Sequence, residues 1–200
     1  MKHLVGKYQI HFTTDRYIKQ VLQDKEYGFL DYYPTIIDIG ANIGMFSLSM
    51  YDKADKIFAI EPSEENINHL KTTIEANGLN KIFPIQAAIS DTSMVKMLYR
   101  HGEAGGGGWK LDEQGDLPVQ TFSLVDFMDI HKIDYADLVK IDVEGHEDII
   151  FGGSFFPKDR VGTIIGEWHN ENLNHITKLL EWMGYRFIDV GNNHFLARKK

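Results

Sequence analysis

The residues that decide the fold are 36–44, which read Ile36-Ile37-Asp38-Ile39-Gly40-Ala41-Asn42-Ile43-Gly44. An apolar run ends in a carboxylate, a glycine-rich turn follows, and a helical pattern of apolar residues begins just after it. This order is typical of a buried strand that leads into a tight turn and then a helix. Rossmann-like folds hold nucleotide cofactors at such a junction, so we expect a cofactor site here. An ordinary strand–turn–helix junction, with glycines used only for their geometry, is the alternative.

The charge of this turn indicates which cofactor it suits. Dinucleotide sites use the pattern G-x-G-x-x-G and place a helix N-terminus against pyrophosphate. Here Asn42 and Met45 occupy the second and third glycine positions. We expect Asp38 in the mouth of the site, where its carboxylate would repel a phosphate. A cofactor with a cationic amine and no phosphate, such as S-adenosylmethionine, fits better.

Strands and helices alternate from Thr35 onward. Apolar runs predict strands at 35–39, 56–60, 82–86, 136–141 and 161–166, with a first helix over 43–52. Such alternation predicts a parallel sheet with helices on both faces. Two further strands, 185–190 and 194–198, are joined by Gly191-Asn192-Asn193, a hairpin signal. The fold class is therefore α/β, a Rossmann-like, mostly parallel sheet whose last strand is antiparallel.

Two segments lie outside this alternation. Residues 1–34 form an N-terminal arm followed by a helix that Thr13-Thr14-Asp15 would cap, either as a lid over the pocket or simply packed on the sheet. Residues 35–200 form the main domain. Residues 101–116 are rich in glycine and lie between strands predicted at 94–99 and 119–121. We expect this loop to be mobile, either as a substrate-facing flap carrying Trp109 or as an exposed hairpin tip.

Composition narrows the classes of partner. The 200 residues carry a net charge of −8, which argues against a nucleic-acid partner. The chain has no cysteine, which excludes disulfides, thiolate metal sites and a cysteine nucleophile. No signal-peptide pattern opens the chain, and no apolar run approaches the roughly 20 residues that span a bilayer. We expect a soluble, cytoplasmic protein with no membrane partner; the oligomeric state stays open, a homodimer included.

An acidic residue follows the second predicted strand. Glu61 stands 21 positions beyond Gly40. A carboxylate at this place can accept hydrogen bonds from the hydroxyls of a ribose, and Pro62 stiffens the turn beneath it. A mere neighbour of the helix cap Ser63 is the alternative.

With these features in place, the chain resembles the FkbM family of S-adenosylmethionine-dependent class I methyltransferases. The resemblance covers about residues 35–169, and the Lys-Ile-Asp-Val-Glu-Gly segment narrows it to this family. The matching stretches are Ile37-Asp38-Ile39-Gly40-Ala41-Asn42-Ile43-Gly44, Ala59-Ile60-Glu61-Pro62, Ala88-Ile89-Ser90-Asp91, Val119-Gln120-Thr121, Val139-Lys140-Ile141-Asp142-Val143-Glu144-Gly145-His146-Glu147 and Glu167-Trp168-His169.

The resemblance implies a seven-stranded sheet and S-adenosylmethionine as cofactor. It also implies methyl transfer, mostly to hydroxyl oxygens of sugars, natural products and other small molecules. The cofactor-binding residues that it implies are Asp38, Gly40, Ala41, Asn42, Gly44, Glu61, Pro62, Ser63, Ala88, Ile89 and Asp142.

Methyl transfer to a hydroxyl needs a base for the acceptor proton. The candidates at the strand ends are His169, His146, Asp142, Glu167 and Glu144, with His169 preferred, then His146, then Asp142. His146 lies near a predicted helix N-terminus, which favours the neutral imidazole that a base requires. For Glu144 and Glu147, plain helix capping is the alternative.

We assign no metal ligand, because nothing in the spacing demands one. Asp142, His146, Glu167 and His169 could nevertheless gather round a divalent cation, as carboxylates do in metal-dependent hydroxyl methyltransferases. Two other functions remain open, a non-catalytic cofactor-binding protein and an NAD-dependent oxidoreductase. The sequence does not name the methyl acceptor, which we expect to be a small molecule or a carbohydrate.

Overall fold

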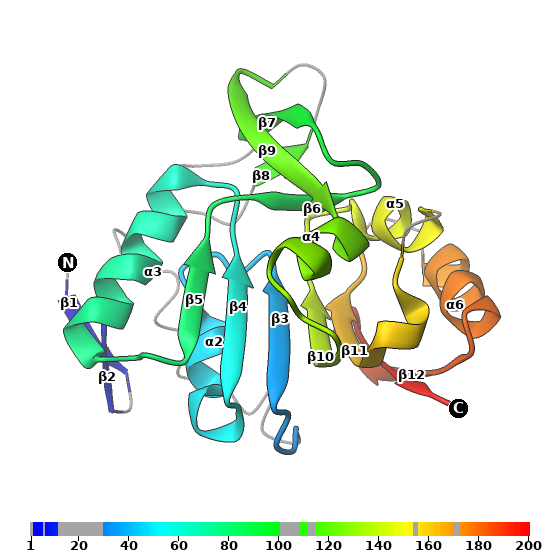
Figure 1. The fold of residues 1–200 in the computed structure, drawn as a ribbon, viewed down its shortest axis with the longest axis horizontal. Helices are drawn as coiled ribbons and strands as arrows, with labels where there is room; N and C mark the ends of the chain where they lie inside the picture. The colour runs from blue at the N-terminus through cyan, green and yellow to red at the C-terminus, as the bar shows by residue number, and fades with distance from the viewer. Residues whose placement is uncertain are drawn as a thin grey trace.

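The computed structural model describes residues 2–5, 7–11, 30–100, 109–111, 115–153, 156–169 and 173–200. Its centre is a seven-stranded sheet in the order β12-β13-β11-β10-β3-β4-β5 (Figure 1). The strands are β3 (Thr35–Ile39), β4 (Lys56–Ile60), β5 (Ile82–Ile85), β10 (Ala136–Ile141), β11 (Val161–Glu167), β12 (Tyr185–Gly191) and β13 (His194–Lys199). β13 pairs antiparallel with both β11 and β12, and the other pairs are parallel. The predicted α/β fold class, with its terminal hairpin, is confirmed.

Helices cover both faces of this sheet, as its apolar strands require. They are α2 (Met45–Ser49), α3 (Glu64–Asn77), α4 (Leu124–Ile130), α5 (Glu147–Gly152) and α6 (Leu173–Trp182), with 3-10 turns η1 (Tyr51–Lys53) and η2 (Lys158–Arg160). Side chains of β3 alternate between two cores. Ile36 packs with α2 and α3, whereas Ile37 and Ile39 pack with α4, α5 and α6. Asp38 therefore shares the face of Ile36.

The parallel register brings three functional stretches to one edge of the sheet. Ile39 pairs with Ile60 on one side and with Ile141 on the other. The residues that follow these strands, Gly40, Glu61 and Asp142, are therefore neighbours. Backbone hydrogen bonds continue past the strand ends, because Gly40 N donates to Ile60 O at 3.0 Å and Asp142 N donates to Ile39 O at 3.1 Å.

A smaller sheet lies above this edge in Figure 1 and has the order β6-β9-β7-β8. It consists of β6 (Ala88–Ser90), β7 (Val95–Arg100), β8 (Trp109–Leu111) and β9 (Leu117–Ser123). The predicted antiparallel strand at 94–99 is confirmed by β7, which pairs with β8 and β9. Most of the glycine-rich segment, 101–108 and 112–114, lies outside the described residues, and so does the prediction that it is mobile. The side chain of Trp109 is also outside them.

The N-terminal residues form a hairpin, β1 (Lys2–Val5) with β2 (Tyr8–His11), rather than a single extended arm. Gln9 N donates to Asn77 Oδ1 at 2.8 Å, so β2 is fastened to the end of α3. Ile10 is fully buried in the same core as α3. The hairpin lies at the opposite end of the sheet from the strand ends that carry Gly40 (Figure 1). The helix predicted after Thr13 falls within residues 12–29, which are not described.

The first helix is shorter than the predicted 43–52. Asn42 and Gly44 both adopt left-handed backbone conformations, with φ of 51° and 90°, so the turn extends to residue 44. The helix stops at Ser49 and a 3-10 turn follows, where Lys53 Nζ donates to Leu30 O at 2.7 Å and Tyr33 N donates to Lys53 O at 2.8 Å. Within the described residues, none of the helices is long and apolar enough to cross a bilayer.

Candidate functional site

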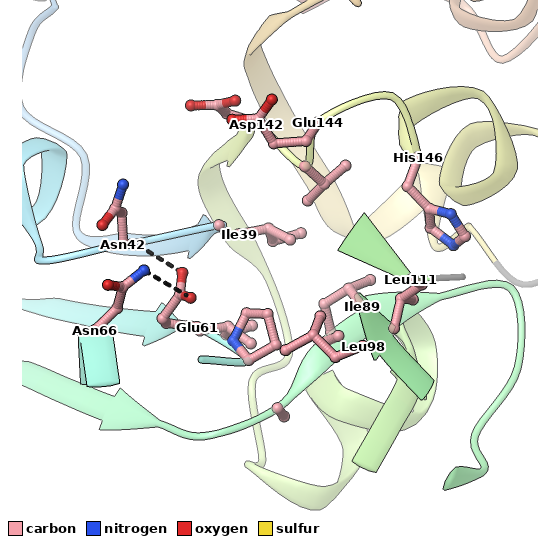
Figure 2. A pocket seen from close by; sticks show the side chains of 16 residues that line it. Ile39, Asn42, Glu61, Asn66, Ile89, Leu98, Leu111, Asp142, Glu144 and His146 are labelled. Atoms are coloured by element: carbon pink, nitrogen blue, oxygen red, sulfur yellow. Dashed lines mark hydrogen bonds between the residues drawn. The ribbon is translucent and has the colours of Figure 1, made fainter. Parts of the chain in front are cut away.

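A cavity opens at the carboxyl ends of β3, β4 and β10 (Figure 2), the edge of a parallel sheet where small-molecule sites are commonly found. Seven predicted cofactor residues line it, namely Gly40, Asn42, Glu61, Pro62, Ala88, Ile89 and Asp142. The other lining residues are Ile39, Ile60, Asn66, Ala87, Leu98, Leu111, Val143, Glu144 and His146. Asp38, Ala41, Gly44 and Ser63 are not among them. Leu98 and Leu111 come from β7 and β8, so the small sheet forms one wall.

The turn after β3 depends on residues that tolerate positive φ. Gly40 has φ of 77°, and a Cβ there would lie 1.8 Å from the carbonyl oxygen of Asp142. Asn42 takes a left-handed conformation, which asparagine tolerates better than most residues. Gly44 has a packing role, since a Cβ there would lie 2.3 Å from a methyl of Leu70 in α3. The turn is therefore pressed against β10 on one side and α3 on the other.

Glu61 is a buried carboxylate in the cavity wall. Its Oε1 accepts from Ser63 N at 3.0 Å. Oε1 also accepts from Asn66 Nδ2 at 3.3 Å, and Oε2 accepts from Asn42 N at 2.8 Å (Figure 2). A carboxylate has about four acceptor positions, so at least one remains for a hydroxyl. Burial raises the pKa of Glu61 to about 7, although these hydrogen bonds oppose the rise.

The prediction that Asp38 lies in the mouth of the site is wrong. Its side chain is fully buried beneath the turn, where Ser47 Oγ donates to Oδ2 at 2.6 Å. Its Oδ1 lies 3.4 Å from Nζ of Lys140, its neighbour in register on β10. Lys140 Nζ also donates to Gly40 O at 2.8 Å and lies 3.4 Å from Asp142 Oδ2. Burial raises the pKa of Asp38, and the charge of Lys140 opposes that rise.

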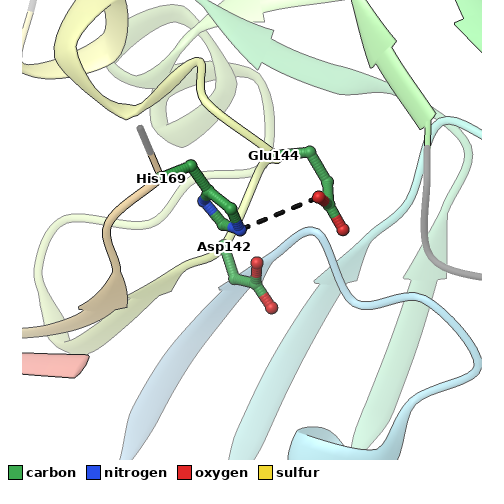
Figure 3. A group of neighbouring side chains, drawn as sticks. All are labelled: Asp142, Glu144 and His169. Atoms are coloured by element: carbon green, nitrogen blue, oxygen red, sulfur yellow. Dashed lines mark ion pairs between the residues drawn. The ribbon is translucent and has the colours of Figure 1, made fainter. Parts of the chain in front are cut away.

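Asp142, Glu144 and His169 come together beside the cavity (Figure 3). Glu144 has a positive φ of 55°, in the loop between β10 and α5. The fully buried Glu147 holds this loop, because its Oε1 accepts from Val143 N at 3.1 Å and from Gly145 N at 3.2 Å. The same oxygen lies 2.9 Å from His169 Nδ1. This hydrogen bond raises the pKa of His169 to about 9, so the imidazole keeps its proton at neutral pH.

His146 is in a different environment, on the cavity wall away from His169. Its Nε2 lies 2.9 Å from Ser90 Oγ, which also donates to Asp91 Oδ1 at 2.9 Å. We assign the Nε2 hydrogen to this contact, because the hydroxyl hydrogen of Ser90 is used by Asp91. Nδ1 then carries the lone pair. Burial lowers the pKa of His146, and the charge of Lys96 lowers it further. The imidazole is therefore neutral, as predicted, but the main cause is burial and not the nearby helix end.

Glu167 ends β11 between two histidines. Its carboxylate lies 3.9 Å from His169 Nε2 and 3.8 Å from His194 Nε2. Burial raises the pKa of Glu167, and the negative charge of Asp142 raises it further. The β11–β13 pairing places His194 directly opposite Glu167. Sequence reasoning missed His194, Asn66, Lys140 and the link from Glu147 to His169. The hairpin register could have indicated His194, but the other three depend on tertiary contacts.

The cavity fits S-adenosylmethionine better than a dinucleotide. Glu61 offers an acceptor for a ribose hydroxyl, and Ile60, Ala88, Ile89, Leu98 and Leu111 supply an apolar surface for a flat base. Asp142 and Glu144 place negative charge where a cationic ligand can use it. Within the described residues, no lysine or arginine lines the cavity to neutralise a pyrophosphate.

The comparison with known proteins agrees with this description. The family model "Methyltransferase FkbM domain" matches residues 38–187. The chain is 27% identical over 144 residues to the hexuronic acid methyltransferase AglP of Haloferax volcanii. That alignment covers 72% of this chain and 59% of AglP, so the chain spans less than two thirds of this curated relative.

Solved structures share the fold at low identity. A methyltransferase FkbM from Methylobacillus flagellatus superposes with a TM-score of 0.59 at 14% identity, over 89% of this chain and 47% of that one. A precorrin-6y C5,15-methyltransferase from Geobacter metallireducens gives 0.59 at 14% identity, over 96% and 94%. TrmK of M. capricolum in complex with S-adenosyl-homocysteine gives 0.53 at 15% identity, over 95% and 70%. Since the family model covers most of the chain and the fold agrees, the chain belongs to the FkbM methyltransferase family.

Proposed function

We propose that the chain is an S-adenosylmethionine-dependent methyltransferase that methylates an oxygen of a carbohydrate or another small molecule. The observation that carries this proposal is the cavity wall built round Glu61. It combines an acceptor for a ribose hydroxyl, an apolar surface and two further carboxylates. Membership of the FkbM family supports the reaction class.

The cofactor, when bound, supplies a methyl group on a sulfonium that is already activated for transfer. The protein therefore has to hold, orient and deprotonate the acceptor. Glu61 and Asn42 would hold the ribose side of the cofactor, and Gly40 allows the turn to approach closely. Asp142 would face the cationic end, with Lys140 limiting the excess of negative charge behind it.

For the base, the electrostatics favour His146 over His169. A base must be unprotonated at working pH, and His146 has a lowered pKa whereas His169 has one of about 9. His146 also lines the cavity, with Nδ1 free of hydrogen bonds to the described residues. We propose that His146 Nδ1 takes the proton of the acceptor hydroxyl. His169 and Glu167 would then bind or position the acceptor.

A carbohydrate is the acceptor class that the comparisons favour, because AglP is described as a hexuronic acid methyltransferase. The net charge of −8 supports a small acceptor over a nucleic acid, whose phosphates this chain would repel. TrmK, whose B. subtilis structure is described as a tRNA methyltransferase, shares the fold alone.

The test is a panel of acceptors read out as S-adenosylhomocysteine release. The panel contains hexuronic-acid glycans, neutral sugars and small phenols. We expect release with at least one carbohydrate, and loss of release in Glu61→Ala but not in Glu75→Gln, an exposed glutamate on α3. Tight cofactor binding with no release from any acceptor would instead support a non-catalytic cofactor-binding protein.

A further inference from the structure

We propose that Asp142, Glu144 and His169 bind one divalent cation beside the cofactor cavity. One ligand atom from each of these residues lies within 4.8 Å of the other two (Figure 3). The residues come from two strand ends, since Asp142 and Glu144 follow β10 and His169 follows β11. His146, which sequence reasoning placed in a cation group, is bound to Ser90 instead and does not take part.

The spacing of the atoms suits a shared ion better than direct hydrogen bonds. His169 Nε2 lies 3.7 Å from Glu144 Oε2 and 3.9 Å from Glu167 Oε1, beyond hydrogen-bond range. Two ligand atoms that are each about 2.1 Å from one octahedral cation lie roughly 3–4 Å apart. Within the described residues, Nε2 makes no hydrogen bond of its own, while Nδ1 on the same ring makes one at 2.9 Å.

Glu147 gives an observation that is separate from the ligand group. Its side chain is fully buried and directed at His169. Oε1 accepts from Val143 N and Gly145 N, so it faces its neighbours as an acceptor. It therefore accepts from His169 as well, which places a hydrogen on Nδ1. A bound cation would replace the hydrogen on Nε2, the nitrogen that lies 3.7 Å from Glu144 Oε2. Metal-binding histidines are usually held in this way by a carboxylate behind the ring.

The other oxygen of Glu147, Oε2, is buried without a hydrogen-bond partner in the part of the chain that the structure describes. Buried carboxylate oxygens are seldom left without a partner, so this one indicates a polar group still to be added beside Glu147.

The ligand set selects the kind of cation. One imidazole combined with carboxylates suits Mn²⁺ and related first-row ions, whereas Ca²⁺ sites are built from oxygens alone. Glu167 is close enough to add a third carboxylate. Asp142 and Glu144 also line the cavity, so the cation would meet hydroxyl or carboxylate oxygens of the acceptor. This last role, unlike the site itself, rests on the proposed function.

The test is a titration of Mn²⁺ into metal-free full-length protein, with free Mn²⁺ followed by electron paramagnetic resonance. We expect one saturable site. His169→Ala and Glu144→Gln should each weaken it at least about tenfold, and Glu147→Gln by about 10- to 100-fold. His175→Ala, which removes an exposed histidine on α6, should leave it unchanged. Retained S-adenosylhomocysteine binding shows that each variant is folded.

Absence of saturable Mn²⁺ binding, or binding that both His169→Ala and Glu144→Gln leave intact, would overturn the site. A wrong proposed function would give a different result: Mn²⁺ would bind as expected, but no acceptor would lead to release of S-adenosylhomocysteine. Methyl transfer that a chelator leaves undiminished, in a protein that binds Mn²⁺, would overturn only the role of the cation in holding the acceptor.

Discussion

Cofactor affinity should depend on pH through Glu61. The pKa of this buried carboxyl is about 7, and ribose hydroxyls donate much more strongly to its ionised form than to the neutral acid. At about pH 5.5 roughly one molecule in 30 carries ionised Glu61, so the affinity for S-adenosylhomocysteine should be lower than at about pH 8 by up to about 30-fold, or ~2 kcal/mol. Isothermal titration calorimetry at the two pH values measures this difference.

The control for this experiment is Glu61→Gln, which should bind more weakly at about pH 8 and lose most of the pH dependence. Glu75→Gln should keep the wild-type profile, because its side chain is exposed on α3. Equal wild-type affinity at both pH values, or the same pH dependence in Glu61→Gln, would refute the assignment of the ribose to Glu61.

The same carboxyl links stability to pH. Its folded pKa of about 7 exceeds the unfolded value of 4.5, so the ligand-free fold retains a proton that the unfolded chain releases. The free energy of unfolding should therefore fall as pH rises from about 4.5 to 7, by up to about 3 kcal/mol from this group. Urea denaturation of wild type against Glu61→Gln across this range isolates the effect, and a constant difference between them would contradict it.

Three further predictions concern other parts of the site. Gly40→Ala should cost about 3 kcal/mol or more, because the new Cβ meets Asp142 O, whereas Gly78→Ala, also at positive φ but in open space, should cost about 1–2 kcal/mol in urea denaturation. Lys140→Met should cost about 3–5 kcal/mol by leaving Asp38 buried without its cation, and the double variant with Asp38→Asn should recover most of this loss. If the double variant is no more stable than Lys140→Met alone, the ion pair is not the cause. His146→Ala should lower kcat by about 10²–10⁴-fold and remove the acidic limb of the pH–rate profile, and an unchanged profile would exclude it as the base.

Local patterns predicted the framework of the fold because it depends on short-range features. Apolar runs located the strands of the main sheet, since parallel strands are buried on both faces. Ser63, the helix cap expected after the second strand, accepts from the backbone three residues on. The predicted length of the first helix was wrong, because the left-handed turn continues to Gly44 and a 3-10 turn replaces the helix after Ser49.

The electrostatics of the site could not be predicted in the same way. Lys140 lies within an apolar strand, and its partner Asp38 is 102 positions away in sequence, beside it only through the β3–β10 register. Glu147 looked like an ordinary first-turn acid, but the fold turns it inward to His169. The different environments of His146 and His169 follow from these tertiary contacts, so the sequence could not show that the pKa of His146 is lowered and that of His169 is raised.

The central claim is that the cavity beside Glu61 takes S-adenosylmethionine. Calorimetric titration with S-adenosylhomocysteine, with NAD⁺ as competitor, tests it most directly. We predict one-site binding that Glu61→Ala weakens by about 1–3 kcal/mol and that NAD⁺ does not displace. Absence of S-adenosylhomocysteine binding, wild-type affinity in Glu61→Ala, or displacement by NAD⁺ would contradict the claim.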